Sequence, residues 1–376
     1  MFDLTIPFSH ATSLVRRIFS EALLLLRLAV RLWTYLGVGW KWSIQLLRLV
    51  LYAMLLLPGF LQMIVFYVFS PRVRRSVVYG PKPRQRLDLY FPPHPHPHAA
   101  YPVVIYVTGG AWTIGYKAWG ALLARRLSEQ GVLVACLDYR NFPQGDALDM
   151  LEDVNTGISW VLSRIHRFGG DPDSVTLVGQ SAGGHLAGLA LIKQVGKGET
   201  GGGHSGVAWS PACLKAFVGV SGAYDLAALA EHLHRRGLYR NVFDRIMTLG
   251  CKGGARPAFE ALSPLQAARR LPPGAAGMLP YVLLIHGTAD KTVPAEGSAQ
   301  LCEALQSSGA PSCRCLLIPG KTHTAFLLED PMRGGRDLLM DTVLGAVKGS
   351  GDSENHVYGT LCPGFLCDMA GWVCPF

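Results

Sequence analysis

The chain contains 376 residues, of which 49% are hydrophobic, with 35 Lys and Arg against 26 Asp and Glu. This length suits one large α/β domain with an additional segment, or two modest domains. The net charge of +9 resides in residues 1–86, which hold 12 basic and 2 acidic residues (+10), whereas residues 87–376 hold 23 and 24 (−1). Because the basic residues flank apolar sequence, they indicate contact with anionic lipid headgroups, and nucleic acid is excluded as the expected partner.

The nine cysteines show neither a repeating pattern nor the paired spacing of a zinc site. They stand at positions 136, 213, 251, 302, 313, 315, 362, 367 and 374. A domain of this size needs no disulfide scaffold, so we expect reduced thiols in a cytosol-facing domain and no bound metal. The first residues lack the basic region and the cleavage site of a secretory signal peptide.

Two apolar stretches near the N-terminus indicate membrane association. Residues 16–48 place five cations on one side of an apolar helix, which suits an interfacial helix or a tilted spanning helix. Residues 49–69 are an uncharged stretch of 21 residues, which is long enough to cross about 30 Å of hydrocarbon as a helix. Pro58 and Gly59 would kink this span or turn a re-entrant hairpin, and a buried core helix is the remaining alternative. We therefore expect residues 1–75 to form a membrane-associated segment with membrane helices.

Residues 76–348 alternate strand-like and helix-like segments and form the expected catalytic domain. Residues 77–91 indicate paired strands, and residues 92–102 a Pro-rich linker whose three histidines we interpret as a solvated loop. Further strands are expected near 103–107, 132–138, 175–178, 216–220, 281–285 and 314–318, and helices near 118–130, 147–166, from 182, and near 295–306 and 333–347. This alternation predicts a mostly parallel central sheet with helices on both faces, whose ligands bind at the carboxyl ends of the strands.

The segment Gly-Gln-Ser-Ala-Gly at 179–183 lies between an expected strand and an expected helix. This order is that of a nucleophile elbow, in which small residues on either side of Ser allow a strained turn to lift the hydroxyl above the sheet. Ser181 is therefore the candidate nucleophile. The alternative is an ordinary serine in a Gly-rich connection.

Two further residues follow in the order of α/β-hydrolases, in which the acid and then the histidine come after the serine. Asp290 follows a strand and is the candidate acid, with Asp225 in reserve and helix capping as the alternative role. His323 follows the last strand and is the candidate base, the alternative being a loop histidine at the surface. His185 and His286 are interpreted as structural.

The segment Thr-Gly-Gly-Ala-Trp at 108–112, directly after a strand, is the candidate oxyanion loop. An oxyanion hole needs two backbone N–H groups, each worth roughly 3 kcal/mol of transition-state stabilisation. Ala182 supplies one by its position after Ser181, and the loop supplies the other. Thr108 stands where esterases usually carry His, and a plain Gly-Gly turn is the alternative.

Together with Asp-Tyr-Arg-Asn-Phe-Pro-Gln-Gly at 138–145, these motifs resemble those of the plant isoprenylcysteine methylesterases, relatives of the hormone-sensitive-lipase and kynurenine-formamidase groups. The resemblance covers residues 33–347. It implies an α/β-hydrolase fold and hydrolysis of the methyl ester of a C-terminal S-prenylcysteine at endoplasmic reticulum or Golgi membranes, without a cofactor. It assigns Ser181 as nucleophile, Asp290 as acid and His323 as base, and places Gly109, Gly110, Ala111, Gln180 and Ala182 around the oxyanion.

The same resemblance implies prenylated protein C-termini or prenylcysteine methyl esters, and membrane lipid, as partners. The catalytic domain is expected to face the cytosol, where prenylated proteins reside. Residues 227–274 are the expected cap over the acyl or prenyl pocket, and residues 349–376 are expected to be a disordered tail. An arylformamidase or a broad carboxylesterase would use the same triad, and a catalytically dead ligand receptor is a third alternative.

Overall fold

The computed structural model describes residues 40–94, 100–197, 207–237, 240–248, 255–349 and 356–376. These described residues divide into two compact units, one that contains residues 40–54 with 373–375 and one that contains the described residues between Leu55 and Trp372 with Phe376. All strands of the described residues belong to the larger unit, which therefore carries the sheet and its carboxyl edge.

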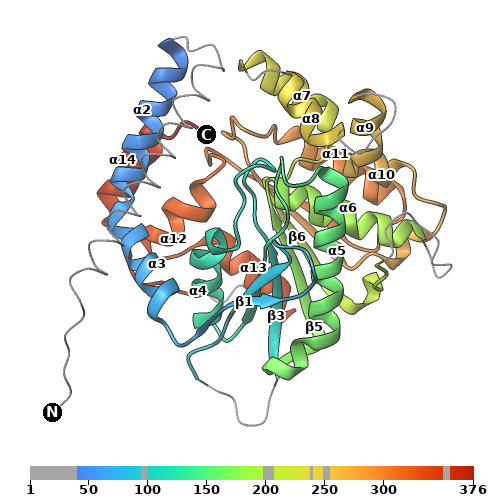
Figure 1. Cartoon of the computed structure of the whole chain (residues 1–376), viewed down its shortest axis with the longest axis horizontal. Coiled ribbons are helices and arrows are strands. Elements are labelled where there is room, and N and C mark those ends of the chain that lie inside the picture. Colours follow the sequence, from blue (N-terminus) through green and yellow to red (C-terminus); the bar gives the residue numbers. More distant parts are fainter. Residues whose placement is uncertain (1–39, 95–99, 198–206, 238–239, 249–254, 350–355) are drawn as a thin grey trace, which may run out of the picture. The chain divides into compact units, whose positions relative to one another are not determined.

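A single eight-stranded sheet forms the centre of the larger unit (Figure 1). Its strands are β1 (Val73–Val78), β2 (Arg86–Tyr90), β3 (Tyr101–Val107), β4 (Leu133–Leu137), β5 (Gly170–Gln180), β6 (Leu214–Val220), β7 (Tyr281–Gly287) and β8 (Cys313–Ile318). The order across the sheet is β1-β2-β4-β3-β5-β6-β7-β8. β1 and β2 pair antiparallel, β2 pairs antiparallel with β4, and all other neighbours are parallel. The prediction of a mostly parallel sheet is confirmed.

The central strands contain continuous apolar runs because both of their faces are covered. Residues 103–107 of β3 are all buried, as is every residue of β4. Parallel strands buried on both sides read as continuous Val, Ile and Leu runs rather than as alternating patterns. This is why the bounds of these strands could be predicted from the sequence to within a few residues.

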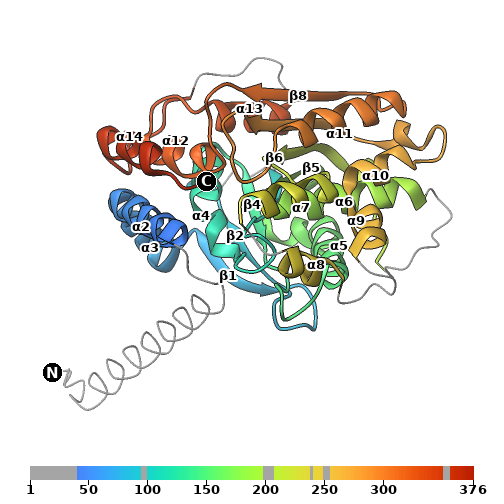
Figure 2. The same cartoon turned by 90° about the horizontal axis from the view of Figure 1, so that it is seen from above.

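Helices cover both faces of the sheet, as Figure 2 shows from above. α5 (Ala147–Arg164), α6 (Ala182–Lys197), α10 (Pro264–Arg269) and α11 (Glu296–Ser307) pack together on one face, and α4 (Ala121–Glu129) and α13 (Leu338–Lys348) on the other. The remaining helices are α2 (Trp40–Leu55), α3 (Leu57–Phe69), α7 (Leu226–Arg235), α8 (Arg240–Thr248), α9 (Ala255–Leu262), α12 (Asp330–Arg333) and α14 (Gly364–Val373). Thus the expected cap region consists of α7 to α10, apart from residues 238–239 and 249–254, which lie outside the described residues.

The apolar N-terminal run forms two helices rather than one. α2 ends at Leu55 and α3 begins at Leu57, with Pro58 in its first turn, where a missing N–H costs no helical hydrogen bond. No single helix among the described residues is long and apolar enough to span a membrane, although the bent pair Ser43–Leu55 and Leu57–Phe69 passes that test together. Most of the predicted interfacial helix, residues 16–39, lies outside the described residues.

The C-terminal tail, residues 349–376, was expected to be disordered, but its described part is folded. Its described part from residue 356 onward pairs with the loop after α12, because Gly335 and Tyr358 form an antiparallel bridge. The amides of Leu361 and Cys362 both donate to the Met332 carbonyl, at 2.8 and 2.9 Å, and α14 follows. The expectation of disorder is therefore wrong for residues 356–372. Their content of Tyr, Leu, Cys, Phe, Met and Trp supplies the apolar surface that a disordered segment lacks.

Candidate active site

The nucleophile elbow is formed as the sequence predicts, between β5 and α6. Ser181 has a φ of +53°, a left-handed conformation that L-residues rarely adopt and that marks functional turns. Both flanking glycines are required, because a Cβ on Gly179 would lie 2.6 Å from the Gly183 carbonyl oxygen and one on Gly183 would collide with the Val107 carbonyl oxygen. The Ser181 amide donates to the Val220 carbonyl at 2.9 Å, which fixes the turn on the neighbouring strand.

His323 joins Ser181 to Asp290. Its Nε2 lies 3.0 Å from Ser181 Oγ, and its Nδ1 lies 2.6 Å from Asp290 Oδ2. Since a carboxylate only accepts, Nδ1–H donates to Asp290, and Nε2 is left to accept the serine proton. The three predicted residues therefore meet at the carboxyl edge of the sheet, after β5, β7 and β8.

Asp290 is held by four donors. Its Oδ1 accepts from the amides of Thr292 and Val293, at 2.8 and 2.9 Å, and its Oδ2 accepts from His323 and from His286 Nε2 at 3.1 Å. Burial by itself raises the pKa of this carboxyl, but attraction to His323 and the hydrogen bonds from both histidines and Val293 bring it well below its ordinary value. Asp290 is therefore a carboxylate at neutral pH.

His286 touches the candidate acid directly, which extends its expected structural role. The ring is fully buried, with Nδ1 2.7 Å from Ser298 Oγ and Nε2 near both Asp290 and the Val293 carbonyl, 3.0 Å away. These contacts fix the orientation of the Asp290 carboxylate. The sequence signal for this contact is the short spacing of four residues between His286 and Asp290 at the end of β7.

The candidate oxyanion loop has an unusual backbone. Gly110, Ala111 and Trp112 all have positive φ, at +127°, +48° and +60°. A Cβ on Gly110 would collide with the Gly115 amide, and one on Gly109 would collide with the Gln180 side chain. The loop therefore passes against the elbow, and Gln180 Nε2 lies 3.5 Å from His323 Nε2. The structure thus places Gly109, Gln180 and the triad in one site, with Ala182 directly following Ser181.

Two side chains of the 138–145 motif donate hydrogen bonds to carbonyls in the oxyanion loop and just after it. Tyr139 OH donates to the Thr108 carbonyl at 2.9 Å, and Asn141 Nδ2 donates to the Gly115 carbonyl at 2.6 Å. Arg84 donates to the same Gly115 carbonyl and binds both oxygens of Asp138, at 2.6 and 2.8 Å. Arg84 could not be predicted from a local sequence pattern, because its partners lie 31 and 54 residues away along the chain.

His185 supports the same loop from the elbow helix, in agreement with its expected structural role. Trp112 Nε1 donates to His185 Nδ1 at 3.1 Å, and His185 Nε2 donates to the Leu262 carbonyl at 2.9 Å. Complete burial lowers the pKa of His185 to about 4, so the ring is neutral at physiological pH. In this tautomer each ring nitrogen has a partner.

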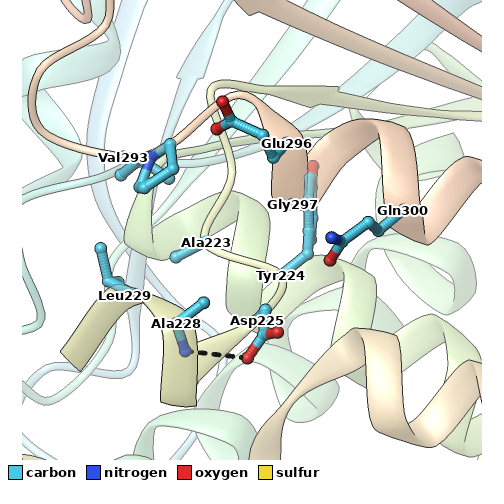
Figure 3. Close-up of a pocket in the computed structure, with 10 residues that line it drawn as sticks. Ala223, Tyr224, Asp225, Ala228, Leu229, Val293, Glu296, Gly297 and Gln300 are labelled. Atoms are coloured by element: carbon cyan, nitrogen blue, oxygen red, sulfur yellow. Dashed lines mark hydrogen bonds between the residues drawn. The ribbon is translucent and has the colours of Figure 1, made fainter. Parts of the chain in front are cut away.

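The reserve acid Asp225 is not part of the triad. Its Oδ1 caps α7 by accepting from the amides of Ala227 and Ala228, at 3.0 and 3.1 Å. Figure 3 shows Asp225 in a pocket between α7 and the start of α11, where Val293 also lies. The cavity volume is about 100 Å³, below the roughly 300 Å³ of typical ligand sites. This pocket is too small for a prenyl chain.

No group of three or more His, Cys, Asp or Glu within the described residues is arranged to hold a metal ion. The Ser181–His323–Asp290 arrangement needs none, because the histidine removes the serine proton and the carboxylate stabilises the resulting imidazolium. Chemically, this geometry is suited to acyl transfer.

The chain is similar to plant proteins that are named as methylesterases. The chain is 46% identical to the probable isoprenylcysteine alpha-carbonyl methylesterase ICMEL1 of Oryza sativa subsp. japonica, over 96% of this chain and 84% of that protein. It is 45% identical to the isoprenylcysteine alpha-carbonyl methylesterase ICME of Arabidopsis thaliana, over 92% and 78%. This chain belongs to the isoprenylcysteine alpha-carbonyl methylesterase family. The BD-FAE family also matches residues 87–305.

A more distant relative is named an esterase, and a solved structure shares the fold. Esterase LipC of Mycobacterium tuberculosis is 31% identical over 69% of this chain and 62% of its own length. The crystal structure of an inhibited esterase B from Lactobacillus rhamnosis has a TM-score of 0.59 and 22% identity, covering 76% of this chain and 90% of that one. The fold is that of the α/β-hydrolases, and this member of the methylesterase family is a carboxylic ester hydrolase.

Proposed function

We propose that this protein is a serine hydrolase that demethylates the C-terminal S-prenylcysteine methyl ester of prenylated proteins. The observation that carries the chemistry is the hydrogen-bonded chain from Ser181 Oγ through His323 to Asp290, at 3.0 and 2.6 Å. The 45–46% identity to isoprenylcysteine methylesterases supports the choice of substrate. No cofactor takes part in the proposed reaction.

Acylation begins when Ser181 Oγ attacks the ester carbonyl carbon and passes its proton to His323 Nε2. The negative oxygen of the tetrahedral intermediate accepts hydrogen bonds from the amides of Gly110, Ala111 and Ala182. Asp290 stabilises the imidazolium through Nδ1. His323 then protonates the methoxy oxygen, the C–O bond breaks, and methanol leaves an acyl ester on Ser181.

Deacylation repeats these steps with water. His323 takes a proton from the attacking water, the second tetrahedral intermediate occupies the same oxyanion site, and His323 returns the proton to Ser181 Oγ. The products are methanol and the free prenylcysteine carboxylate. Gln180 and Gly109 border the oxyanion in this proposal and limit where the substrate carbonyl can lie.

We further propose where this reaction takes place. The basic and apolar residues 1–75 attach the enzyme to endoplasmic reticulum and Golgi membranes, with the catalytic domain, residues 76–348, facing the cytosol. Helices within 227–274 cover the prenyl pocket. This arrangement suits the substrate, because a prenyl chain partitions into the bilayer and enzyme and substrate then meet in two dimensions.

The decisive experiment measures methanol release from an S-farnesylcysteine methyl ester by the detergent-solubilised full chain. N-formylkynurenine and a short-chain aryl acetate are assayed beside it. Turnover of the prenylcysteine ester at least tenfold above both, lost in Ser181→Ala, supports the proposal.

The alternatives predict different results. The 31% identity to esterase LipC favours a broad carboxylesterase as the second candidate, which would hydrolyse the aryl acetate best. Preference for N-formylkynurenine would indicate an arylformamidase. Absence of turnover for all three would indicate a ligand receptor on a hydrolase fold. Each of these outcomes rejects the methylesterase proposal.

A further inference from the structure

Two buried cysteines face each other between α11 and β8. The sulfurs of Cys302 and Cys313 lie 3.2 Å apart, and the two residues are 5% and 6% exposed. A disulfide bond is about 2.05 Å long, so the sulfurs need to approach by roughly 1 Å to form one. No role in the proposed reaction involves either residue.

The surrounding contacts fix the position of this pair. Gln306, one turn after Cys302 in α11, donates through Nε2 to the Cys313 carbonyl at 2.9 Å. Cys313 is also paired with Val282 of β7 in the sheet register. Helix and strand are thus held together at the position where the two sulfurs meet, so the short separation follows from the packing of three elements.

The position of Cys313 in the sheet favours local opening. It is the first residue of β8, which is the edge strand, and it follows the exposed and half-buried loop 308–312. Strand ends at sheet edges open locally at much lower free energy than the core. Among the described residues, Cys315, two residues further along the same strand, has no sulfur contact like that between Cys302 and Cys313, and it provides a natural comparison.

We propose that Cys302 and Cys313 are an oxidation site, at which a low-molecular-weight disulfide such as oxidised glutathione closes an intramolecular disulfide bond linking α11 to β8. One cysteine thiolate attacks the glutathione disulfide and releases one glutathione thiol. The second thiolate then attacks the mixed disulfide and releases the other. Two S–H bonds are lost, one S–S bond forms, and one oxidised glutathione becomes two reduced glutathiones.

Burial sets the rate of this reaction. It raises the pKa of Cys313, because a thiolate is disfavoured away from water, and the nearby Cys302 thiol adds to the effect. The pair therefore stays reduced while the fold is closed and reacts through the locally opened state, faster at pH 8.5 than at pH 7. In a reducing cytosol the two thiols stay reduced, whereas in an oxidising compartment they form the disulfide bond.

Peptide mapping tests this proposal directly. The folded full chain in detergent is incubated with oxidised glutathione at pH 8.5, free thiols are alkylated, and the unreduced protein is digested with trypsin. Cleavage after Lys291 and Arg314 places Cys302 and Cys313 in one peptide, residues 292–314, while Cys315 falls in the next, residues 315–321. The expected product is peptide 292–314 without alkyl groups and two hydrogens lighter than the dithiol. Reduction with dithiothreitol before alkylation should convert it to the doubly alkylated form.

Matched variants identify the partners. Cys315→Ser should leave the product unchanged, and Cys302→Ser should abolish it while keeping the wild-type rate of aryl acetate hydrolysis. A doubly alkylated 292–314 peptide after oxidation would overturn the proposal, as would a cross-link between peptides 292–314 and 315–321. Because the wild-type digest alone distinguishes these results, the test does not depend on the folding of any variant.

Discussion

Replacement of Asp290 by Asn tests the proposed role of the acid most directly. An asparagine has one acceptor oxygen, whereas Asp290 accepts from two amides on Oδ1 and from two histidines on Oδ2. If the oxygen keeps the two amides, the NH₂ group faces His323 Nδ1. His323 must then carry its proton on Nε2, and it can no longer accept the proton of Ser181.

The orientation in which the amide oxygen keeps the two backbone amides costs less free energy than the opposite one. His286 Nε2 retains the Val293 carbonyl, 3.0 Å away, as an acceptor. The opposite orientation leaves the amides of Thr292 and Val293 facing an NH₂ group, which costs roughly 1–3 kcal/mol for each buried donor without a partner. We therefore expect the wrong histidine tautomer, with a loss of about 10⁴ in kcat, or about 5 kcal/mol of activation free energy.

The assay is the steady-state rate of aryl acetate hydrolysis, with the denaturation midpoint of each variant measured alongside. Asp225→Asn is the matched control, because Asn also caps helices well and Asp225 lies outside the triad. Its kcat should stay within about threefold of the wild type, since only surface capping is changed. A loss of less than tenfold in Asp290→Asn, with a folded protein, would refute the assignment of Asp290 as the acid.

Three further predictions address the loop and its supports. Gly110→Ala should lower kcat by about 10²–10³ with little change in KM. At the Gly110 φ of +127° the new Cβ collides with the Gly115 amide, which displaces the oxyanion donors. An unchanged kcat would show that Gly110 is not part of the oxyanion site. Arg84→Met should lower kcat about tenfold in the same assay, because the Gly115 carbonyl then keeps one of its two side-chain donors, Asn141 Nδ2, whereas a change in thermal stability alone would make Arg84 purely structural. His185 should make the protein less stable in acid, because its pKa is about 4 when folded and 6.5 in the reference state. Between these values the unfolded chain binds a proton that the folded chain does not, so the free energy of unfolding falls by about 3 kcal/mol as the pH drops from 6.5 to 4. Urea titrations at both pH values should show this fall in the wild type and a smaller one in His185→Gln, whose amide can replace both hydrogen bonds.

The sequence alone determined the strands, the elbow and the order of the triad. Buried parallel strands are continuous apolar runs, and the glycines around Ser181 are forced by close backbone approach, so both features are local and visible in one dimension. Asp290 and His323 could be predicted because strand ends in a parallel sheet meet at one edge.

The tertiary structure decided the contacts between segments distant in the chain. Arg84 reaches Gly115, just after the oxyanion loop, and residues 358–362 bond to α12 and to the loop after it, through contacts that no local pattern records. The approach of Cys302 to Cys313 likewise depends on how α11 packs against the edge strand. Local propensity and periodicity describe each element separately, whereas these contacts depend on side-chain packing between elements, which only the folded chain specifies.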